Sequence, residues 1–113
     1  MHELSLAMNM VEQIERVMKE EGAQTLVRVK VEIGALSGVE REPMAFCFPV
    51  AIRGTALEGA ELEVKEVPLT VKCLDCDAST HPEMPFIQCQ DCESAQVQIV
   101  DGRDFKITSI EVE

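Results

Sequence analysis

The sequence is poor in aromatic and in basic residues. It has no tryptophan and no tyrosine, so a packed core must be built from aliphatic side chains and four phenylalanines. Ten lysines and arginines stand against 21 aspartates and glutamates, which gives a formal net charge of −11. Because phosphate groups are bound mainly by basic side chains, this balance argues against a nucleic-acid or anionic-membrane partner. Most of the acidic residues are expected to form a solvated surface.

Long apolar runs are also absent. No stretch approaches the roughly 20 residues that cross a bilayer, and the first residues lack the basic and apolar segments of a signal peptide. Five cysteines are present, and thiolates that hold a metal require a reducing compartment. We therefore expect a cytoplasmic protein. No nucleophile–base pair, phosphate loop or paired catalytic carboxylates can be recognised, so the sequence does not predict an enzyme.

Hydrophobic periodicity predicts a small α+β fold. Apolar spacings of three and four over residues 4–21 predict an amphipathic helix, and strict alternation over 25–34 predicts a strand. Residues 44–52 predict a second helix, kinked at Pro49, with a capping box at Ser37 and Glu40 before it. Further strands are expected at 61–67, 97–100 and 105–112, the last with a bulge or at a sheet edge.

These elements suggest two structural units within 113 residues. Residues 1–68 plus 104–113 supply three strands and two helices, enough for one small sheet covered on one face. Residues 69–103 form an insert that is too small for its own apolar core, so it should fold around a metal ion.

The strongest motif lies in that insert. Cys73 and Cys76 form one C-x-x-C pair, and Cys89 and Cys92 form a second pair twelve residues later. Two such pairs predict a tetrahedral four-thiolate site, for which structural Zn²⁺ is the usual ion. Iron in a rubredoxin-type electron carrier is an alternative that a colourless preparation would exclude.

A second candidate site is Met1-His2-Glu3. The α-amine, the amides of His2 and Glu3 and the His2 ring offer four nitrogens in a plane, a set that favours Ni²⁺ or Cu²⁺ over Zn²⁺. On these residues alone, a frayed surface histidine is the competing interpretation. His81 is expected to be a solvated loop residue, with a spare-ligand role as its alternative, and Cys47 a buried apolar residue.

Several segments together resemble one known family. They are M-H-E-L-S-L at the start, V-E-I-G-A-L-S-G-V-E, A-F-C-F, G-A-E-L, the C-x-x-C-x₁₂-C-x-x-C insert and the final I-E-V-E. This combination, which spans essentially the whole chain, is similar to the HypA/HybF nickel-insertion proteins of NiFe-hydrogenase maturation.

The resemblance implies a nickel metallochaperone with an α/β nickel domain and a zinc-ribbon-like insert. It implies that His2, with Met1 and Glu3 nitrogens, binds nickel as cargo, while Cys73, Cys76, Cys89 and Cys92 hold structural zinc. Implied partners are a HypB-like nickel-handling GTPase, the hydrogenase large subunit and, in some members, urease maturation proteins.

Both a monomer and a homodimer are compatible with these features. Some family members have histidines directly after each C-x-x-C, where this chain has Asp77 and Glu93, so zinc-ligand exchange is not expected here. The rival interpretation is a zinc-ribbon interaction adaptor without nickel transfer.

Overall fold

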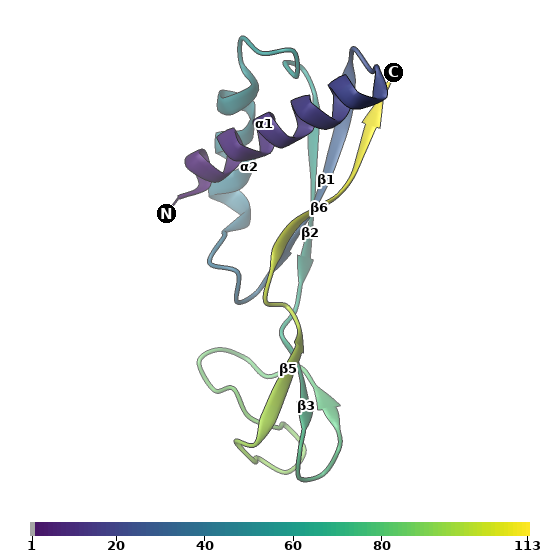
Figure 1. The fold of residues 1–113 in the computed structure, drawn as a ribbon. Coiled ribbons are helices and arrows are strands. Elements are labelled where there is room, and N and C mark those ends of the chain that lie inside the picture. Colours follow the sequence, from purple (N-terminus) through teal and green to yellow (C-terminus); the bar gives the residue numbers. More distant parts are fainter. Residues whose placement is uncertain (1) are drawn as a thin grey trace.

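A computed structural model describes residues 2–113, and these residues form an elongated molecule of 52 × 27 × 16 Å. One end contains both helices and a three-stranded sheet, and the other contains the four-cysteine segment with a second three-stranded sheet (Figure 1). In chain order the elements are α1 (Glu3–Glu21), β1 (Leu26–Gly34), α2 (Arg41–Ile52), β2 (Glu61–Val67), β3 (Thr70–Cys73), β4 (Ser79–Thr80), β5 (Val97–Asp101) and β6 (Phe105–Val112). Neither helix is long and apolar enough to cross a membrane, judged over the described part of the chain.

The first sheet has the order β2-β1-β6, with β1 parallel to β2 and antiparallel to β6. Val29, Val31 and Ile33 of β1 are buried in the core beneath the helices. Arg28 and Lys30, which alternate with these residues along β1, pair with Glu61 and Glu63 respectively on the neighbouring strand β2. The alternation that predicted this strand therefore separates a buried face from a charged one, and the predicted α+β class is confirmed.

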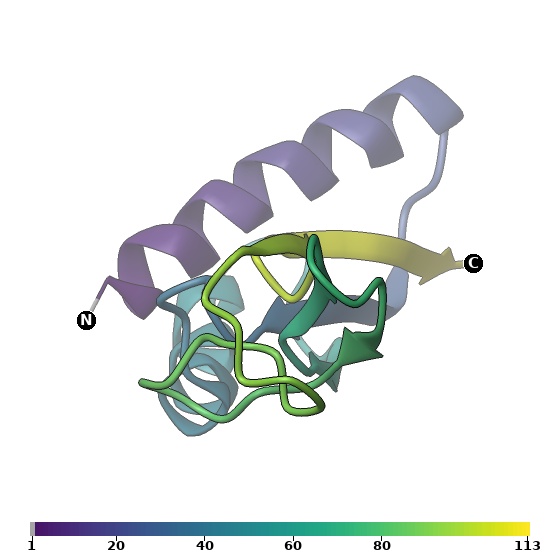
Figure 2. The same cartoon turned by 90° about the horizontal axis from the view of Figure 1, so that it is seen from below.

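The core is aliphatic, as the composition required. From α1 it takes residues at spacings of three and four, namely Ala7, Met10, Val11, Ile14 and Met18, and from α2 it takes Met44, Phe48 and Ile52. Gly22 ends α1 in the left-handed conformation, with φ of 70°. Viewed from the four-cysteine end, α1 runs across the whole width of this unit (Figure 2).

The predicted capping box at Ser37 and Glu40 is wrong. The N-cap of α2 is Glu40 and makes no side-chain cap bond, while the Ser37 hydroxyl accepts a hydrogen bond from the Val39 amide at 3.2 Å. The Glu40 amide instead donates to the carboxylate of Glu3 in α1, at 3.1 Å. A carboxylate from another helix thus replaces the local cap, and α2 continues through Pro49 without ending there.

The irregularity predicted in the last strand is confirmed. Pairing of β1 with β6 steps from Lys30↔Ser109 to Val31↔Ile107, so Thr108 is the extra residue of a bulge. Its hydroxyl donates to the Lys30 carbonyl at 3.2 Å. Strand β6 also lies at the edge of its sheet.

The two sheets meet at a glycine junction formed by Gly34 and Gly102. The Gly34 amide donates to the Asp104 carbonyl at 2.9 Å, and the Leu36 amide donates to the Gly102 carbonyl at 2.8 Å. A Cβ on Gly102, whose φ is 90°, would lie 2.6 Å from the Pro68 carbonyl oxygen. The junction coincides with the predicted division at residues 68/69 and 103/104, and the independence of the two units stays a prediction.

Candidate metal centres

Each C-x-x-C pair begins a tight turn, and we call residues 73–78 the first knuckle and residues 89–94 the second knuckle. Cys73 ends β3, and its amide donates to the Ala78 carbonyl at 2.9 Å while its carbonyl accepts from Asp77 at 3.1 Å. The amides of Asp75 and Cys76 both point at the Cys73 sulfur, at 3.3 Å. Asp77 has a φ of 66°, which turns the chain back toward β4.

The second knuckle repeats most of these hydrogen bonds. The Cys89 amide donates to the Ser94 carbonyl at 2.9 Å, and the Cys89 carbonyl accepts from Glu93 at 2.9 Å. The Cys92 amide points at the Cys89 sulfur at 3.5 Å, and Glu93 has a φ of 63°. The knuckles are therefore equivalent structures, each with a buried first cysteine and an exposed second one.

The four sulfurs converge at one point. Cys73 and Cys92 sulfurs are 3.5 Å apart, as are those of Cys76 and Cys89, and all four sulfurs lie within 4.8 Å of one another. A tetrahedral zinc with Zn–S bonds of about 2.3 Å requires sulfur separations of about 3.8 Å. A disulfide would require about 2.05 Å, and none of these cysteines forms one. The donor set fits a four-thiolate metal ion.

The protonation of Cys73, Cys76 and Cys92 also favours a cation site. The Cys76 amide, followed by the Asp75 amide, lowers the pKa of Cys73 to about 7. The Ala78 amide acts to lower the pKa of Cys76, but contacts with the Cys89, Cys92 and Cys73 sulfurs, together with burial, raise it to about 12. Similarly, the pKa of Cys92 is raised, by its contact with Cys73 acting against the Ser94 amide. Without a central cation, Cys73, Cys76 and Cys92 do not all ionise together near neutral pH.

The predicted N-terminal site is described in part. Met1 lies outside the described residues. His2 is the exposed N-cap of α1, and its carbonyl accepts the first helical bond, from Leu6 at 2.9 Å. Glu3 is only 4% exposed, and its carboxylate accepts the Glu40 amide. The sequence predicted a role for the backbone nitrogen of Glu3, as a nickel ligand. In the structure the Glu3 carboxylate has a second role, because it joins the start of α1 to the start of α2.

The two remaining candidates lie outside the sulfur cluster. The Nδ1 atom of His81 lies 3.1 Å from the Thr70 hydroxyl and 3.3 Å from the Leu69 carbonyl, so this exposed histidine is bound to β3 rather than to the cysteines. Cys47 is half-buried in α2, against the main core.

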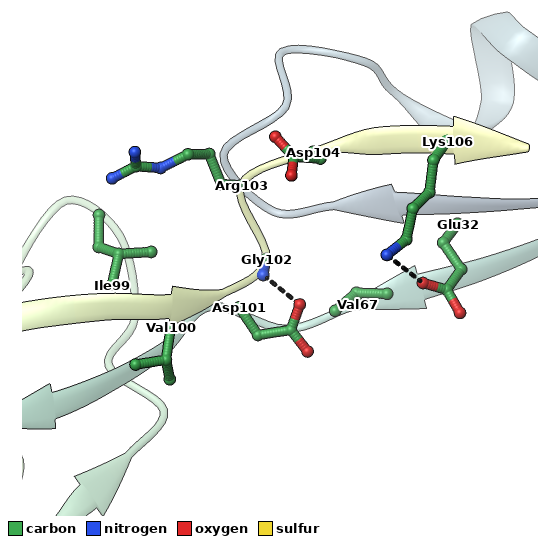
Figure 3. A pocket seen from close by; sticks show the side chains of 9 residues that line it. All are labelled: Glu32, Val67, Ile99, Val100, Asp101, Gly102, Arg103, Asp104 and Lys106. Carbon is green, nitrogen blue, oxygen red and sulfur yellow. Dashed lines mark hydrogen bonds and ion pairs between the residues drawn. The ribbon is translucent and has the colours of Figure 1, made fainter.

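A hollow of about 210 Å³ lies beside the glycine junction (Figure 3). Three of its charged side chains have partners within the chain, since Lys106 pairs with Glu32 at 3.8 Å and the Asp101 carboxylate accepts the Gly102 amide at 2.9 Å. The hollow separates the two sheets rather than gathering metal ligands. The sequence predicted a division of the chain here but not the close approach of Gly34 to Gly102.

Comparison with known proteins gives one family along the whole length. A family model described as hydrogenase/urease nickel incorporation, metallochaperone, hypA, matches residues 1–112. The hydrogenase maturation factor HypA of Chlorobium limicola is 38% identical over 113 residues, covering 100% of this chain and 97% of that protein. The HypA of a Roseiflexus species is 40% identical over 114 residues, covering 100% and 93%.

Solved structures show the same fold. The solution structure of the nickel metallochaperone HypA from Helicobacter pylori matches with a TM-score of 0.68 at 24% identity, covering 99% of this chain and 97% of that one. A second solution structure of a HypA protein matches with a TM-score of 0.73, also at 24% identity, covering 100% and 97%.

Proposed function

Because this chain belongs to the HypA family of hydrogenase/urease nickel-incorporation metallochaperones, we propose that it binds Ni²⁺ at its N-terminus and helps to insert it into the NiFe-hydrogenase large subunit. The observation that carries the proposal is the whole-length family match combined with an exposed His2 at the N-cap of α1. Nickel is cargo in this scheme, and the cysteine cluster is not part of its path.

The proposed nickel ligands are the α-amine of Met1, the amides of His2 and Glu3 and the ring of His2. Binding in this way requires both amides to lose a proton. The first amides of a helix have no acceptor along the helical ladder, and the helical bonding of α1 begins with the Leu6 amide, so this deprotonation breaks none of the i→i−4 hydrogen bonds of α1. The positive end of the helix dipole further favours the deprotonated amides.

Exposure of His2 suits a cargo site. The Glu3 carboxylate, held by the Glu40 amide, anchors the first turn of α1, while the ring of His2 stays exposed to solvent. A firmly placed backbone with an exposed ring provides ligands without enclosing the ion. A partner can then reach the ion, which is what transfer to a HypB-like GTPase or to a hydrogenase or urease maturation partner requires.

The proposed zinc ligands are Cys73, Cys76, Cys89 and Cys92. When bound, zinc supplies a closed four-thiolate centre that ties the two knuckles together and keeps residues 69–103 folded. Residues 1–68 plus 104–113 form the proposed nickel-binding unit. This division is supported by the two separate three-stranded sheets.

The test is nickel titration of protein with a free Met1 amine. We expect a yellow, square-planar Ni²⁺ absorption band that weakens as pH falls, because protons compete for the amine and amides. His2→Ala, and a variant with extra residues before Met1, should lose most of the affinity. The chain has a second histidine, so His81→Ala is the matched control and should bind nickel as the parent protein does.

Equal nickel binding by the parent and His2→Ala would reject the N-terminal site. Loss in His81→Ala instead would move the site to the cysteine segment. Zinc content should stay at one ion per chain in every histidine variant. If cells that carry His2→Ala still produce nickel-loaded hydrogenase, nickel delivery through His2 is rejected. The zinc-ribbon adaptor then remains as the alternative function.

A further inference from the structure

The two knuckles differ in a side-chain contact that joins one to the other. The Ser94 hydroxyl, at the sixth position of the second knuckle, donates to the Asp75 carboxylate, at the third position of the first, with an oxygen–oxygen distance of 2.5 Å. The equivalent pair would join Asp91 with Ala78, and alanine has no hydroxyl to donate. The similarity of the two knuckles would allow this contact twice, but only the Asp75–Ser94 contact can form.

We propose that Asp75 and Ser94 form a latch that holds the knuckles together and positions the four sulfurs for the metal. The proposal rests on the metal site assigned above to the four cysteines. Neither residue is a ligand in it. Both act through the cysteines to which their backbones are bonded, so they are positioning residues.

Ser94 is hydrogen-bonded within the second knuckle, so its contact with Asp75 can help to position Cys89. Its carbonyl accepts the Cys89 amide at 2.9 Å, and its hydroxyl oxygen accepts the Gln96 amide at 3.0 Å while the hydroxyl proton goes to Asp75. The Asp75 amide, in turn, points at the Cys73 sulfur at 3.3 Å. The latch thus connects two short structures, each of which already fixes a buried cysteine.

Other links between the knuckle regions are few. The Leu74 amide donates to the Gln96 carbonyl at 2.8 Å. The Gln90 amide donates to the Thr80 hydroxyl at 3.4 Å, and the Gln90 side-chain carbonyl accepts the His81 amide at 3.2 Å. A hydrogen bond to an ionised carboxylate is stronger than a neutral one. The latch is therefore the strongest polar side-chain link between the first and second knuckles among the described residues, apart from the sulfurs.

The decisive measurement is zinc affinity, from competition with a chromophoric chelator at fixed pH. Ser94→Ala and Asp75→Ala should each weaken binding about five- to tenfold. Asp91→Ala is the matched control, since it removes the same charge at the equivalent position without losing a hydroxyl partner. It should change affinity by less than about twofold. Ser94→Thr keeps the hydroxyl and should bind zinc about as tightly as the parent protein does.

A double variant and the spectra of cobalt-substituted protein distinguish a positioning role for Asp75 and Ser94 from direct metal binding. The double variant Ser94→Ala/Asp75→Ala should be no weaker than either single variant, because both remove the same contact. Cobalt-substituted protein should keep its thiolate-to-metal absorption bands unchanged in all variants. A band shift in Asp75→Ala would mean that the carboxylate coordinates the metal, and the proposal would be overturned.

A gain-of-contact variant provides an independent test. Ala78→Ser places a hydroxyl at the position equivalent to Ser94, opposite Asp91, and should tighten zinc binding by about two- to fivefold. Asp91→Ala in that background should remove the gain. This variant decides the matter if Ser94→Ala fails to fold.

Two results identify which proposal fails. A parent protein that holds no zinc overturns the metal assignment itself. A parent that holds zinc, with Ser94→Ala, Asp75→Ala and Asp91→Ala equal in affinity, overturns the latch alone.

Discussion

Replacing Glu93 with glycine is predicted to tighten metal binding. Glu93 follows the second cysteine of its knuckle and has a φ of 63°, in the left-handed region. Such a backbone costs a residue with a Cβ about 1–2 kcal/mol, a cost that glycine avoids. The side chain of Glu93 is exposed, so its removal gives up no core packing.

The expected gain is smaller than the conformational cost. Glycine also gives the unfolded chain more freedom, which offsets about 0.5–1 kcal/mol. A net gain of about 0.5–1 kcal/mol corresponds to roughly two- to fivefold in affinity. Because folding of this segment is coupled to metal binding, the gain should appear as tighter zinc binding in the chelator competition.

Glu93→Gln is the matched control, because it removes the same charge and keeps the Cβ. Asp77→Gly should gain less than Glu93→Gly, since aspartate adopts left-handed backbone more readily than glutamate and since Asp77 also pairs with Lys72 at 3.3 Å. If Glu93→Gly binds zinc no more tightly than Glu93→Gln, the left-handed turn carries no cost and the reasoning is refuted.

Three further predictions concern the core, the junction and the thiols. Phe48→Ala should lower the free energy of unfolding by about 3–5 kcal/mol in urea denaturation, because Phe48 is fully buried; Phe46→Ala, at an exposed site of the same helix, should have little effect. Gly102→Ala should destabilise by more than about 1 kcal/mol, since its Cβ would meet the Pro68 carbonyl, and unchanged unfolding would contradict the junction geometry. Zinc affinity should fall as pH drops, because protons compete with the metal for the four thiolates, and chelator competition at a series of pH values would measure the loss.

The sequence predicted the fold where the signal was periodic and local. The three-and-four spacing of α1, the alternation of β1 and the broken alternation of β6 all match the structure. It failed at Ser37 and Glu40, where a local capping motif was expected. The competing carboxylate there comes from Glu3, 37 positions away in the chain. Strands β3 and β4 were missed because they have four and two residues, too few for a period to be recognised.

The metal site was likewise predicted only where the sequence signal is local. Spacing alone identified Cys73, Cys76, Cys89 and Cys92, because a C-x-x-C turn directs both sulfurs to one side whatever surrounds it. The sequence also singled out His2 and gave the family by its motifs. The Asp75–Ser94 contact had no such signal, since it depends on how one knuckle is placed against the other.

Residue order by itself determined the amphipathic helix, the alternating strands and the four sulfur ligands, since each follows from contacts within a few residues. Only the tertiary structure decided that a buried Glu3 carboxylate anchors the start of α2, that Gly34 and Gly102 join the two sheets, and that Ser94 reaches Asp75. Those pairs are far apart in the chain, and no periodicity links them. They meet because burial of the aliphatic core and the convergence of four cysteines bring their segments together.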